Sequence, residues 1–210
     1  MTLKNREPFS SLFVYNFFNW SIVSPLLYTY FRGKVYGVEN IPKSGSYIII
    51  SNHASNVDPP ILAVAARRPV AFMAKEELFK IPGLKTIITL CGAYPVKRNA
   101  SDLSAIKSAI KFLDRGWLVG IFLEGTRTTD GKINDPKLGA ALIAAKTQTP
   151  IIPACIVGTQ TKVNSKTVSS TPVTIRFGEI VPPPKSKKKA DLQAFTQHCT
   201  QIINQMHDEG

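Results

Sequence analysis

The sequence has few acidic residues and little of the residue chemistry that supports nucleophilic, metal or redox catalysis. Its 210 residues include 14 Asp and Glu against 26 Lys and Arg, a formal net charge of +12, with only three Cys and three His. The cysteines form no C-x-x-C pair, which argues against a zinc or dithiol site and favours reduced thiols in a cytosol-facing protein. The sequence also lacks the G-x-S-x-G elbow of serine hydrolases and the glycine spacing of a P-loop.

The excess of positive charge predicts an anionic partner, for which nucleic acid, anionic lipid and phosphorylated substrates are the candidates. The basic residues are scattered along the chain, and no zinc-finger, RNA-recognition or helix-turn-helix pattern is present, which argues against nucleic acid. One cluster, residues 181–189, joins three prolines to four lysines and is either a membrane-contacting patch or a solvated turn. The hydrophobic fraction of 44% suits one domain with a substantial core.

Charge is also missing near the N-terminus, where no charged residue occurs between Glu7 and Arg32. Nine of the 19 aromatic residues fall in this interval, but polar residues and Pro25 interrupt it, which disfavours both a signal peptide and a bilayer-spanning helix. Aromatic-rich, uncharged segments of mixed polarity favour the headgroup zone of a membrane. We therefore expect two short helices, at about residues 8–20 and 22–31, that lie in one leaflet. A single span, or a helix packed on the domain, are the alternatives.

After this segment, short apolar runs alternate with helical patterns, which predicts an α/β sheet. The expected division is a membrane-interface segment at residues 1–35 and an α/β domain at residues 36–210. The expected strands are residues 47–51, 70–74, 93–96, 118–123, 151–157 and 173–177. One helix is expected directly after Asp58. The other expected helices cover residues 75–80, 84–91, 103–114, 137–146 and 190–207.

The strongest indication of chemistry is a histidine five positions before an aspartate, His53 and Asp58, directly after the apolar run 47–50. A buried strand that ends in this way puts an imidazole and a carboxylate where open α/β folds bind ligands. A carboxylate on Nδ1 fixes the tautomer in which Nε2 is a base. Asp58, followed by Pro59, is also a typical helix N-cap, and one carboxylate oxygen is able to fill each role. The other two histidines fall in a polar helix pattern, so His53 is the candidate general base.

Other predicted strand ends carry candidate binding residues. A hydrophobic strand runs into Glu124-Gly125-Thr126-Arg127. Here the glycine lets backbone N–H groups face an anion, Arg127 suits bidentate phosphate binding, and Glu124 is able to orient a hydroxyl or the arginine. Arg98 and Lys75 follow two further strands and are able to join the same anion pocket. Taken singly, these residues are also typical of salt-bridged turns and solvated surfaces.

Together these residues resemble the glycerolipid acyltransferases, the family typified by 1-acyl-sn-glycerol-3-phosphate acyltransferase. Four family blocks occur in order over residues 52–154: Asn52-His53 with Asp58, Gly92 with Arg98, Phe122 with Glu124-Gly125-Thr126-Arg127, and Ile152-Pro153. The resemblance implies an α/β fold like that of glycerol-3-phosphate acyltransferase, with a mixed central sheet flanked by helices.

The resemblance also implies an O-acyltransferase reaction. His53, oriented by Asp58, would deprotonate an acceptor hydroxyl, which would attack the thioester of acyl-CoA or acyl-carrier protein directly. Arg127 and Arg98, with Lys75 as a third cation, would hold the phosphate of lysophosphatidic acid, and Glu124 its glycerol end. Glycerol 3-phosphate or another lysophospholipid are alternative acceptors. No metal or further cofactor is expected, and the expected surface partner is anionic lipid on the cytoplasmic face of a membrane. A lipase-like hydrolase and a non-catalytic lipid-binding protein are the rival interpretations.

Overall fold

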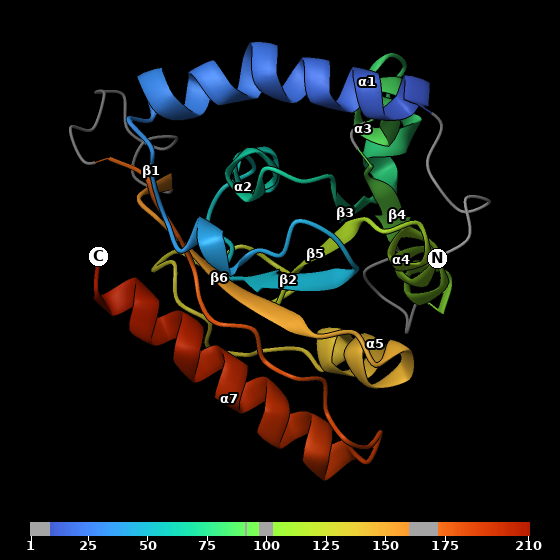
Figure 1. Cartoon of the computed structure of the whole chain (residues 1–210), viewed down its shortest axis with the longest axis vertical. Helices are drawn as coiled ribbons and strands as arrows, with labels where there is room; N and C mark the ends of the chain where they lie inside the picture. Colours follow the sequence, from blue (N-terminus) through green and yellow to red (C-terminus); the bar gives the residue numbers. More distant parts are fainter. Residues whose placement is uncertain (1–8, 91, 97–102, 160–171) are drawn as a thin grey trace.

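Figure 1 shows the computed structural model, which describes residues 9–90, 92–96, 103–159 and 172–210. Its strands are β1 (Lys34–Tyr36), β2 (Tyr47–Ser51), β3 (Val70–Lys75), β4 (Tyr94–Val96), β5 (Leu118–Phe122), β6 (Ile151–Val157) and β7 (Thr174–Phe177). Its α-helices are α1 (Phe9–Phe18), α2 (Asp58–Ala66), α3 (Leu84–Leu90), α4 (Leu103–Asp114), α5 (Gly139–Thr147) and α7 (Lys189–Asp208). Shorter helical turns are η2 (Asn19–Val23), η3 (Leu26–Tyr30), η4 (Val38–Asn40) and η5 (Glu76–Lys80).

The strands form one mixed seven-stranded sheet in the order β1-β7-β6-β2-β5-β3-β4. The five strands from β6 to β4 are parallel, whereas β7 runs antiparallel to β6 and pairs in parallel with β1. The N-terminal helix and α2 pack on one side of the sheet, and α4, α5 and α7 lie on the other (Figure 1). The mixed α/β sheet flanked by helices is therefore confirmed. Because β2, β5, β3 and β4 are parallel, their carboxyl ends meet at one edge.

The central position of β2 in the sheet explains why its sequence is apolar. Ile48, Ile49 and Ile50 of β2 are essentially inaccessible to solvent, because β2 has a strand on each side and helices on both faces of the sheet. In the next strand, Gly120 of β5 makes room for a neighbour: a Cβ there would lie 2.1 Å from the ring of Phe72 in β3. The glycine thus lets an aromatic ring lie flat against the sheet close to its carboxyl edge.

The predicted strands are all present, within one or two residues at their ends. The strand β1 was missed because it has three residues, lies at the sheet edge and alternates exposed with half-buried positions. The helix α5 begins at Gly139 instead of residue 137, because the N–H of Lys137 is bonded to the carbonyl of Leu123 at the end of β5. Cys91, expected at the end of the helix at 84–91, lies outside the described residues.

The structure of the N-terminal segment differs from the prediction of two short helices. Its backbone is helical without a break from Phe9 to Tyr30, and Ser24 and Pro25 both have right-handed helical dihedrals (Figure 1). In an α-helix, positions four apart drift around the axis by about 40° at each step. The wider π turns η2 and η3 offset this drift. As a result, one stripe of residues spaced by four faces the domain and is buried, namely Tyr15, Asn19, Val23, Leu27 and Phe31.

Tyr15 ties this helix to the sheet. Its hydroxyl accepts the N–H of Val70 at 3.0 Å and donates to the carbonyl of Arg68 at 3.4 Å. Its ring meets Trp117 edge-on, with centroids 5.3 Å apart. One face of the helix is therefore packed on the domain. Among the described residues, no helix combines the length and apolar character needed to cross a bilayer.

We expect Tyr15→Phe to lower the free energy of unfolding, because it leaves the buried N–H of Val70 without its acceptor. The expected loss is about 1–2 kcal/mol, measured by urea denaturation. Tyr28→Phe is the matched control, since Tyr28 lies on the same helix but is 44% exposed. Equal stability of the two variants would contradict the docking role of Tyr15.

Candidate active site

The structure brings His53 and Asp58 together. His53 follows the end of β2, Asp58 is the first residue of α2, and the imidazole Nδ1 lies 2.9 Å from Asp58 Oδ2. The Asp58 side chain is fully buried, whereas that of His53 is 12% exposed. The same Oδ2 accepts the N–H groups of Ala54 at 2.7 Å and Ser55 at 2.8 Å. Since this oxygen already acts as an acceptor, Nδ1 carries the proton of the imidazole, and Nε2 is left as the basic nitrogen.

The expected second role of Asp58, as a helix cap, is wrong. The residue in the N-cap position of α2 is Val57, and no side chain caps the helix. Pro59 and Pro60 occupy the first turn and have no N–H for a cap to accept. The carboxylate therefore folds back onto the loop before the helix. Its Oδ1 is buried and has no hydrogen-bond partner among the residues that the structure describes.

A stack of aromatic rings supports the imidazole. The ring of His53 lies on that of Phe122 with centroids 4.0 Å apart and planes 16° apart, and Phe122 in turn stacks on Phe72 at 5.6 Å. Gly120 and Phe122 lie two residues apart in β5 and so share one face of the sheet, which explains why Phe72 and Phe122 meet there. Sequence reasoning noted Phe122 only as part of a motif. The glycine two positions before the aromatic residue in β5 was the available signal.

Asn52 anchors the loop that carries His53. It is 1% exposed, and its amide donates to the carbonyls of Gly131 and Ile156, both at 2.7 Å, while its Oδ1 accepts the N–H of Ile156 at 2.8 Å. The side chain thus joins the end of β2 to β6 and to the loop after β5. The sequence indicated only that this Asn precedes the His; its partners are 79 and 104 residues away along the chain.

The Glu124-Gly125-Thr126-Arg127 turn follows β5 at the same edge of the sheet. Gly125 has φ of +69°, a left-handed conformation that favours glycine, and Gly125, Thr126 and Arg127 are all exposed. The N–H of Thr128 donates to the carbonyl of His53 at 2.8 Å, so the turn lies beside the candidate base. Arg127 is thus exposed, one residue before the contact of Thr128 with His53.

Glu124 has a contact that the sequence did not predict. Its carboxylate accepts the N–H of Asn134 at 2.9 Å through Oε2 and that of Asp135 at 3.2 Å through Oε1. Glu124 is 9% exposed. We call residues 128–137 the strap, because this stretch is bound at several points around the turn. In this structure both oxygens of Glu124 hold the strap, and a role in binding an acceptor stays a prediction.

The other two candidate cations lie further along the same edge. Lys75 is the last residue of β3, is exposed, and is separated from β2 by β5. Its register partner in β4 is Val96, two residues before Arg98. Arg98 itself lies outside the described residues. The strand order therefore places Lys75 and the end of β4 on the same side of β5.

The described cysteines are not candidates for a nucleophile. Cys155 in β6 and Cys199 in α7 are both free and buried. Burial raises the pKa of each thiol to about 12, so neither forms appreciable thiolate at neutral pH. This agrees with the expectation of buried thiols, and it argues against either residue as a nucleophile.

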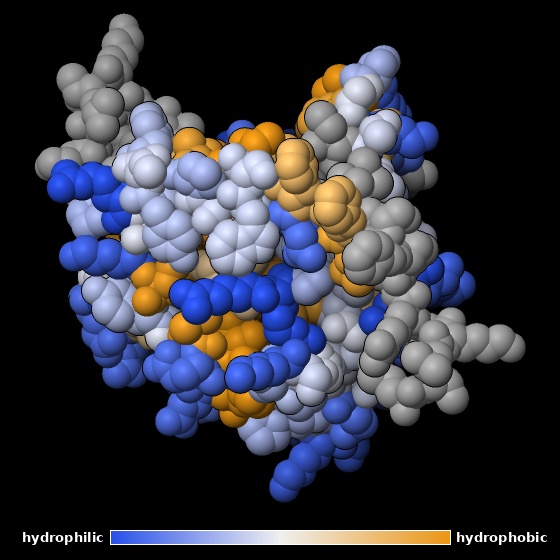
Figure 2. Space-filling view, turned by 45° about the horizontal axis from the view of Figure 1, so that its top comes forward, coloured by the Kyte–Doolittle hydropathy of each residue, from blue (hydrophilic) through white to orange (hydrophobic). Residues whose placement is uncertain are grey.

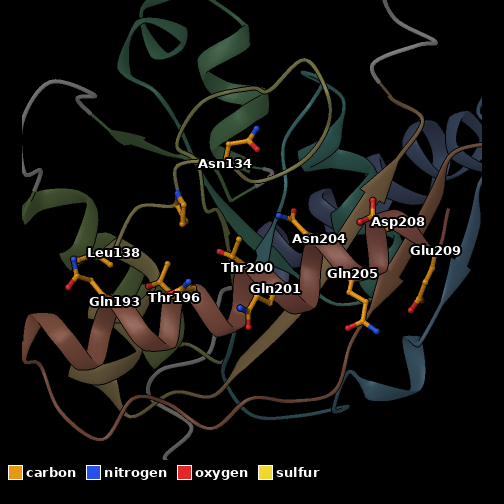
Figure 3. Close-up of a pocket in the computed structure, with 12 residues that line it drawn as sticks. Asn134, Leu138, Gln193, Thr196, Thr200, Gln201, Asn204, Gln205, Asp208 and Glu209 are labelled. Atoms are coloured by element: carbon orange, nitrogen blue, oxygen red, sulfur yellow. The ribbon is translucent and has the colours of Figure 1, made fainter.

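A groove of about 930 Å³ runs along α7 next to the strap (Figure 3). Its lining consists mainly of amide and hydroxyl side chains, from Asn134, Pro136, Leu138, Gln193, Thr196, Gln197, Thr200, Gln201, Asn204, Gln205, Asp208 and Glu209. Asn134 belongs to both regions, because it lines the groove while its N–H binds Glu124. The groove and the candidate active site thus share the strap as a wall.

Comparison with known proteins identifies the family of the chain. The acyltransferase family model matches residues 32–157, and the chain therefore belongs to the acyltransferase family. The chain is 32% identical over 203 residues to the 1-acyl-sn-glycerol-3-phosphate acyltransferase of Streptococcus pneumoniae, covering 88% of this chain and 67% of that protein. It is 32% identical over 143 residues to a chloroplastic 1-acyl-sn-glycerol-3-phosphate acyltransferase of Brassica napus, covering 67% of this chain and 41% of that protein.

A solved structure shares the fold. The crystal structure of the 1-acyl-sn-glycerophosphate acyltransferase PlsC from Thermotoga maritima superposes with a TM-score of 0.69 at 30% identity, covering 91% of this chain and 77% of that one. The matches to four curated relatives span 39% to 62% of the lengths of those proteins. The family and the fold are thus established.

Proposed function

We propose that the protein transfers an acyl chain from an acyl thioester to the sn-2 hydroxyl of lysophosphatidic acid, giving phosphatidic acid. The observation that carries this proposal is the buried Asp58 on His53 Nδ1, at the same strand edge as the exposed Gly125–Arg127 turn. A base and an anion-binding turn side by side suit an acceptor that has a hydroxyl and a phosphate on neighbouring carbons. The names of the relatives support the same acceptor.

In the proposed reaction, His53 Nε2 removes the proton of the acceptor hydroxyl as the oxygen attacks the thioester carbonyl. The tetrahedral intermediate collapses with cleavage of the carbon–sulfur bond, and the imidazolium returns its proton to the leaving thiolate. Asp58 stabilises the imidazolium and holds its ring in place. The donor is acyl-CoA or acyl-carrier protein; both are anionic, and both suit a chain with a net charge of +12.

The phosphate of the acceptor is assigned to the Gly125–Arg127 turn, with Lys75 and Arg98 as further cations of the same edge. Arg127 offers a planar pair of donors that matches two phosphate oxygens. Glu124 contributes by fixing the strap and with it the conformation of the turn. The anion is held by backbone N–H groups and a guanidinium, while the hydroxyl points toward His53.

We expect Arg127→Ala to raise the KM for lysophosphatidic acid by about 10- to 100-fold, the size of one or two charge-assisted hydrogen bonds. The kcat should change little, because the phosphate contact is equally strong in the ground state and the transition state. Initial rates over a range of acceptor concentrations measure both constants. Lys146→Ala, an exposed cation at the end of α5, is the control. An unchanged KM in Arg127→Ala would remove this residue from the acceptor site.

The N-terminal helix is the proposed membrane contact. The side of the helix away from the domain exposes large hydrophobic residues, among them Phe13 (61%), Phe17 (63%) and Trp20 (60%). Turning the top of Figure 1 forward shows hydrophobic and weakly polar side chains interleaved on that face (Figure 2). Aromatic side chains of this kind favour the headgroup zone, where the lysolipid is found. We propose that the protein rests on the cytoplasmic face of a membrane through this helix.

The lysine cluster at residues 185–189 does not share that face. It precedes and begins α7, which lies at the opposite side of the molecule from α1 (Figure 1). One flat bilayer cannot contact both. Of the two interpretations of the lysine cluster, we therefore favour a solvated turn. The membrane contact is assigned to the N-terminal helix alone.

Replacing Phe13, Phe17 and Trp20 together by Ser should lower the fraction of protein that sediments with vesicles of anionic phospholipid by at least about tenfold. Because all three side chains are mostly exposed, the free energy of unfolding should stay within about 1 kcal/mol of the wild type. Tyr36→Ser, at an exposed aromatic in β1, is the matched control. Unchanged sedimentation of the triple variant would show that the helix is not the membrane contact.

A further inference from the structure

The strap is bound at both ends to residues that follow the strands β2 and β5 of the candidate active site. At its start, the N–H of Thr128 donates to the carbonyl of His53 at 2.8 Å, and at its end the N–H of Lys137 donates to the carbonyl of Leu123 at 2.7 Å. Between these points it has no regular secondary structure. Its conformation therefore depends on the side chains that bind its backbone from outside.

One of these side chains is Asn204 of α7, which lies outside every motif of the sequence analysis. Its Oδ1 accepts the N–H of Ile133 and its Nδ2 donates to the carbonyl of the same residue, both at 3.0 Å. Figure 3 shows Asn204 rising from α7 toward the interior of the molecule, whereas Gln205 points away. An ion pair between Lys132 and Asp208 lies beside this contact. The last turns of α7 thus hold the middle of the strap.

The contact has direct consequences for Glu124. Ile133 is 3% exposed, so both of its backbone groups need partners inside the protein, and Asn204 supplies them. The next two residues, Asn134 and Asp135, donate their N–H groups to the Glu124 carboxylate. Glu124 leads directly into the Gly125–Arg127 turn. A chain of hydrogen bonds therefore runs from α7 to the turn that is assigned to the acceptor phosphate.

We propose that Asn204 is a positioning residue for the acceptor site. Its hydrogen bonds to Ile133 fix the conformation of the strap, the strap fixes the Glu124 carboxylate, and Glu124 fixes the anion-binding turn that follows it. This inference rests on the proposed function, because it takes the turn as the site of the acceptor phosphate. Misplacement of a binding group by about 1 Å is enough to weaken a reaction strongly. The two hydrogen bonds of the Asn204 side chain are to the backbone of Ile133, and neither involves His53 or Asp58.

The test compares Asn204→Ala with the wild type by initial rates of lysophosphatidic acid acylation. The KM for the lysolipid should rise about tenfold, which corresponds to one or two lost hydrogen bonds, while kcat stays within about twofold. The KM for the thioester and the pH dependence of kcat should not change. Asn204→Asp keeps the acceptor for the Ile133 N–H but loses the donor, and should give an intermediate rise. Gln201→Ala and Gln205→Ala, at exposed positions of the same helix, are the controls.

Two further measurements separate positioning from a loss of folded protein and from a wrong acceptor. Amide hydrogen exchange of Ile133, Asn134 and Asp135 should become faster in Asn204→Ala, with unchanged exchange in β2. Titration calorimetry with a short-chain lysophosphatidic acid, without a thioester, should show the same loss of affinity. If the wild type forms no phosphatidic acid, the proposed function fails, but a lower lysolipid affinity of the variant still supports the positioning role. The positioning role would be overturned if Asn204→Ala kept the wild-type KM and lysolipid affinity. It would also be overturned if the only change were a fall in kcat in proportion to a loss of thermal stability.

Discussion

Replacing His53 by Ala should reduce kcat by about 10³-fold, within the range that positioned general bases supply. The imidazole is the group of the site that is able to take the hydroxyl proton, and its Nε2 is left free by the Nδ1 contact with Asp58. The KM values should change little, because His53 acts on the reacting hydroxyl and the lipid is held by other groups. The measurement is the rate of acyl transfer from a labelled thioester under saturating acceptor.

The variant should remain folded, which makes its kinetics interpretable. Asp58 Oδ2 still accepts the N–H groups of Ala54 and Ser55 after the ring is removed, so the loop keeps part of its hydrogen bonding. Circular dichroism and thermal unfolding check this. His198→Ala, at an exposed position in α7, is the matched control and should retain full activity. An active His53→Ala would mean that the imidazole is structural.

The second large effect is expected for Asp58→Asn, with kcat reduced by about 10²- to 10³-fold. The carboxamide oxygen is able to take the place of Oδ2 and accept the same three hydrogen bonds. Its amide nitrogen then replaces Oδ1, which has no hydrogen-bond partner within the described part of the chain. The geometry is therefore largely kept, while the negative charge that stabilises the imidazolium is lost.

A double-mutant cycle separates this effect from simple unfolding. If Asp58 acts through the imidazole, adding Asp58→Asn to His53→Ala should lower kcat by less than about threefold. Equal reductions by Asp58→Asn in both backgrounds would show that the carboxylate acts only on the fold. Hydrogen exchange of the Ala54 and Ser55 amides reports directly whether the loop is intact in each variant.

The sheet was predictable because its signals are local. Runs such as Ile48–Ile50 and Leu118–Phe122 contain enough buried apolar residues to identify a strand without its partners. The histidine and the aspartate were predictable for the same reason, since only six residues, 52–57, join the end of a strand to the start of a helix. The short edge strand β1 has no such run, and only its pairing with β7 makes it a strand.

The parts that failed or were missed depend on distant partners. The single N-terminal helix, with Pro25 inside it, exists because its buried stripe packs on the domain and Tyr15 reaches Val70, 55 residues away. Asn52, Glu124 and Asn204 each bind backbone groups of the strap, and no spacing within the sequence reveals this. These roles follow from burial, because a polar side chain inside the protein forms hydrogen bonds with the backbone groups that lie near it.

The most direct test of the account is the product of the wild-type protein. Purified protein is supplied with lysophosphatidic acid and with labelled acyl-CoA or acyl-carrier protein, beside His53→Ala. The account predicts labelled phosphatidic acid, with the label at the sn-2 position, from the wild type and its loss in the variant. No product from the wild type with either donor, or equal amounts from both proteins, would contradict it.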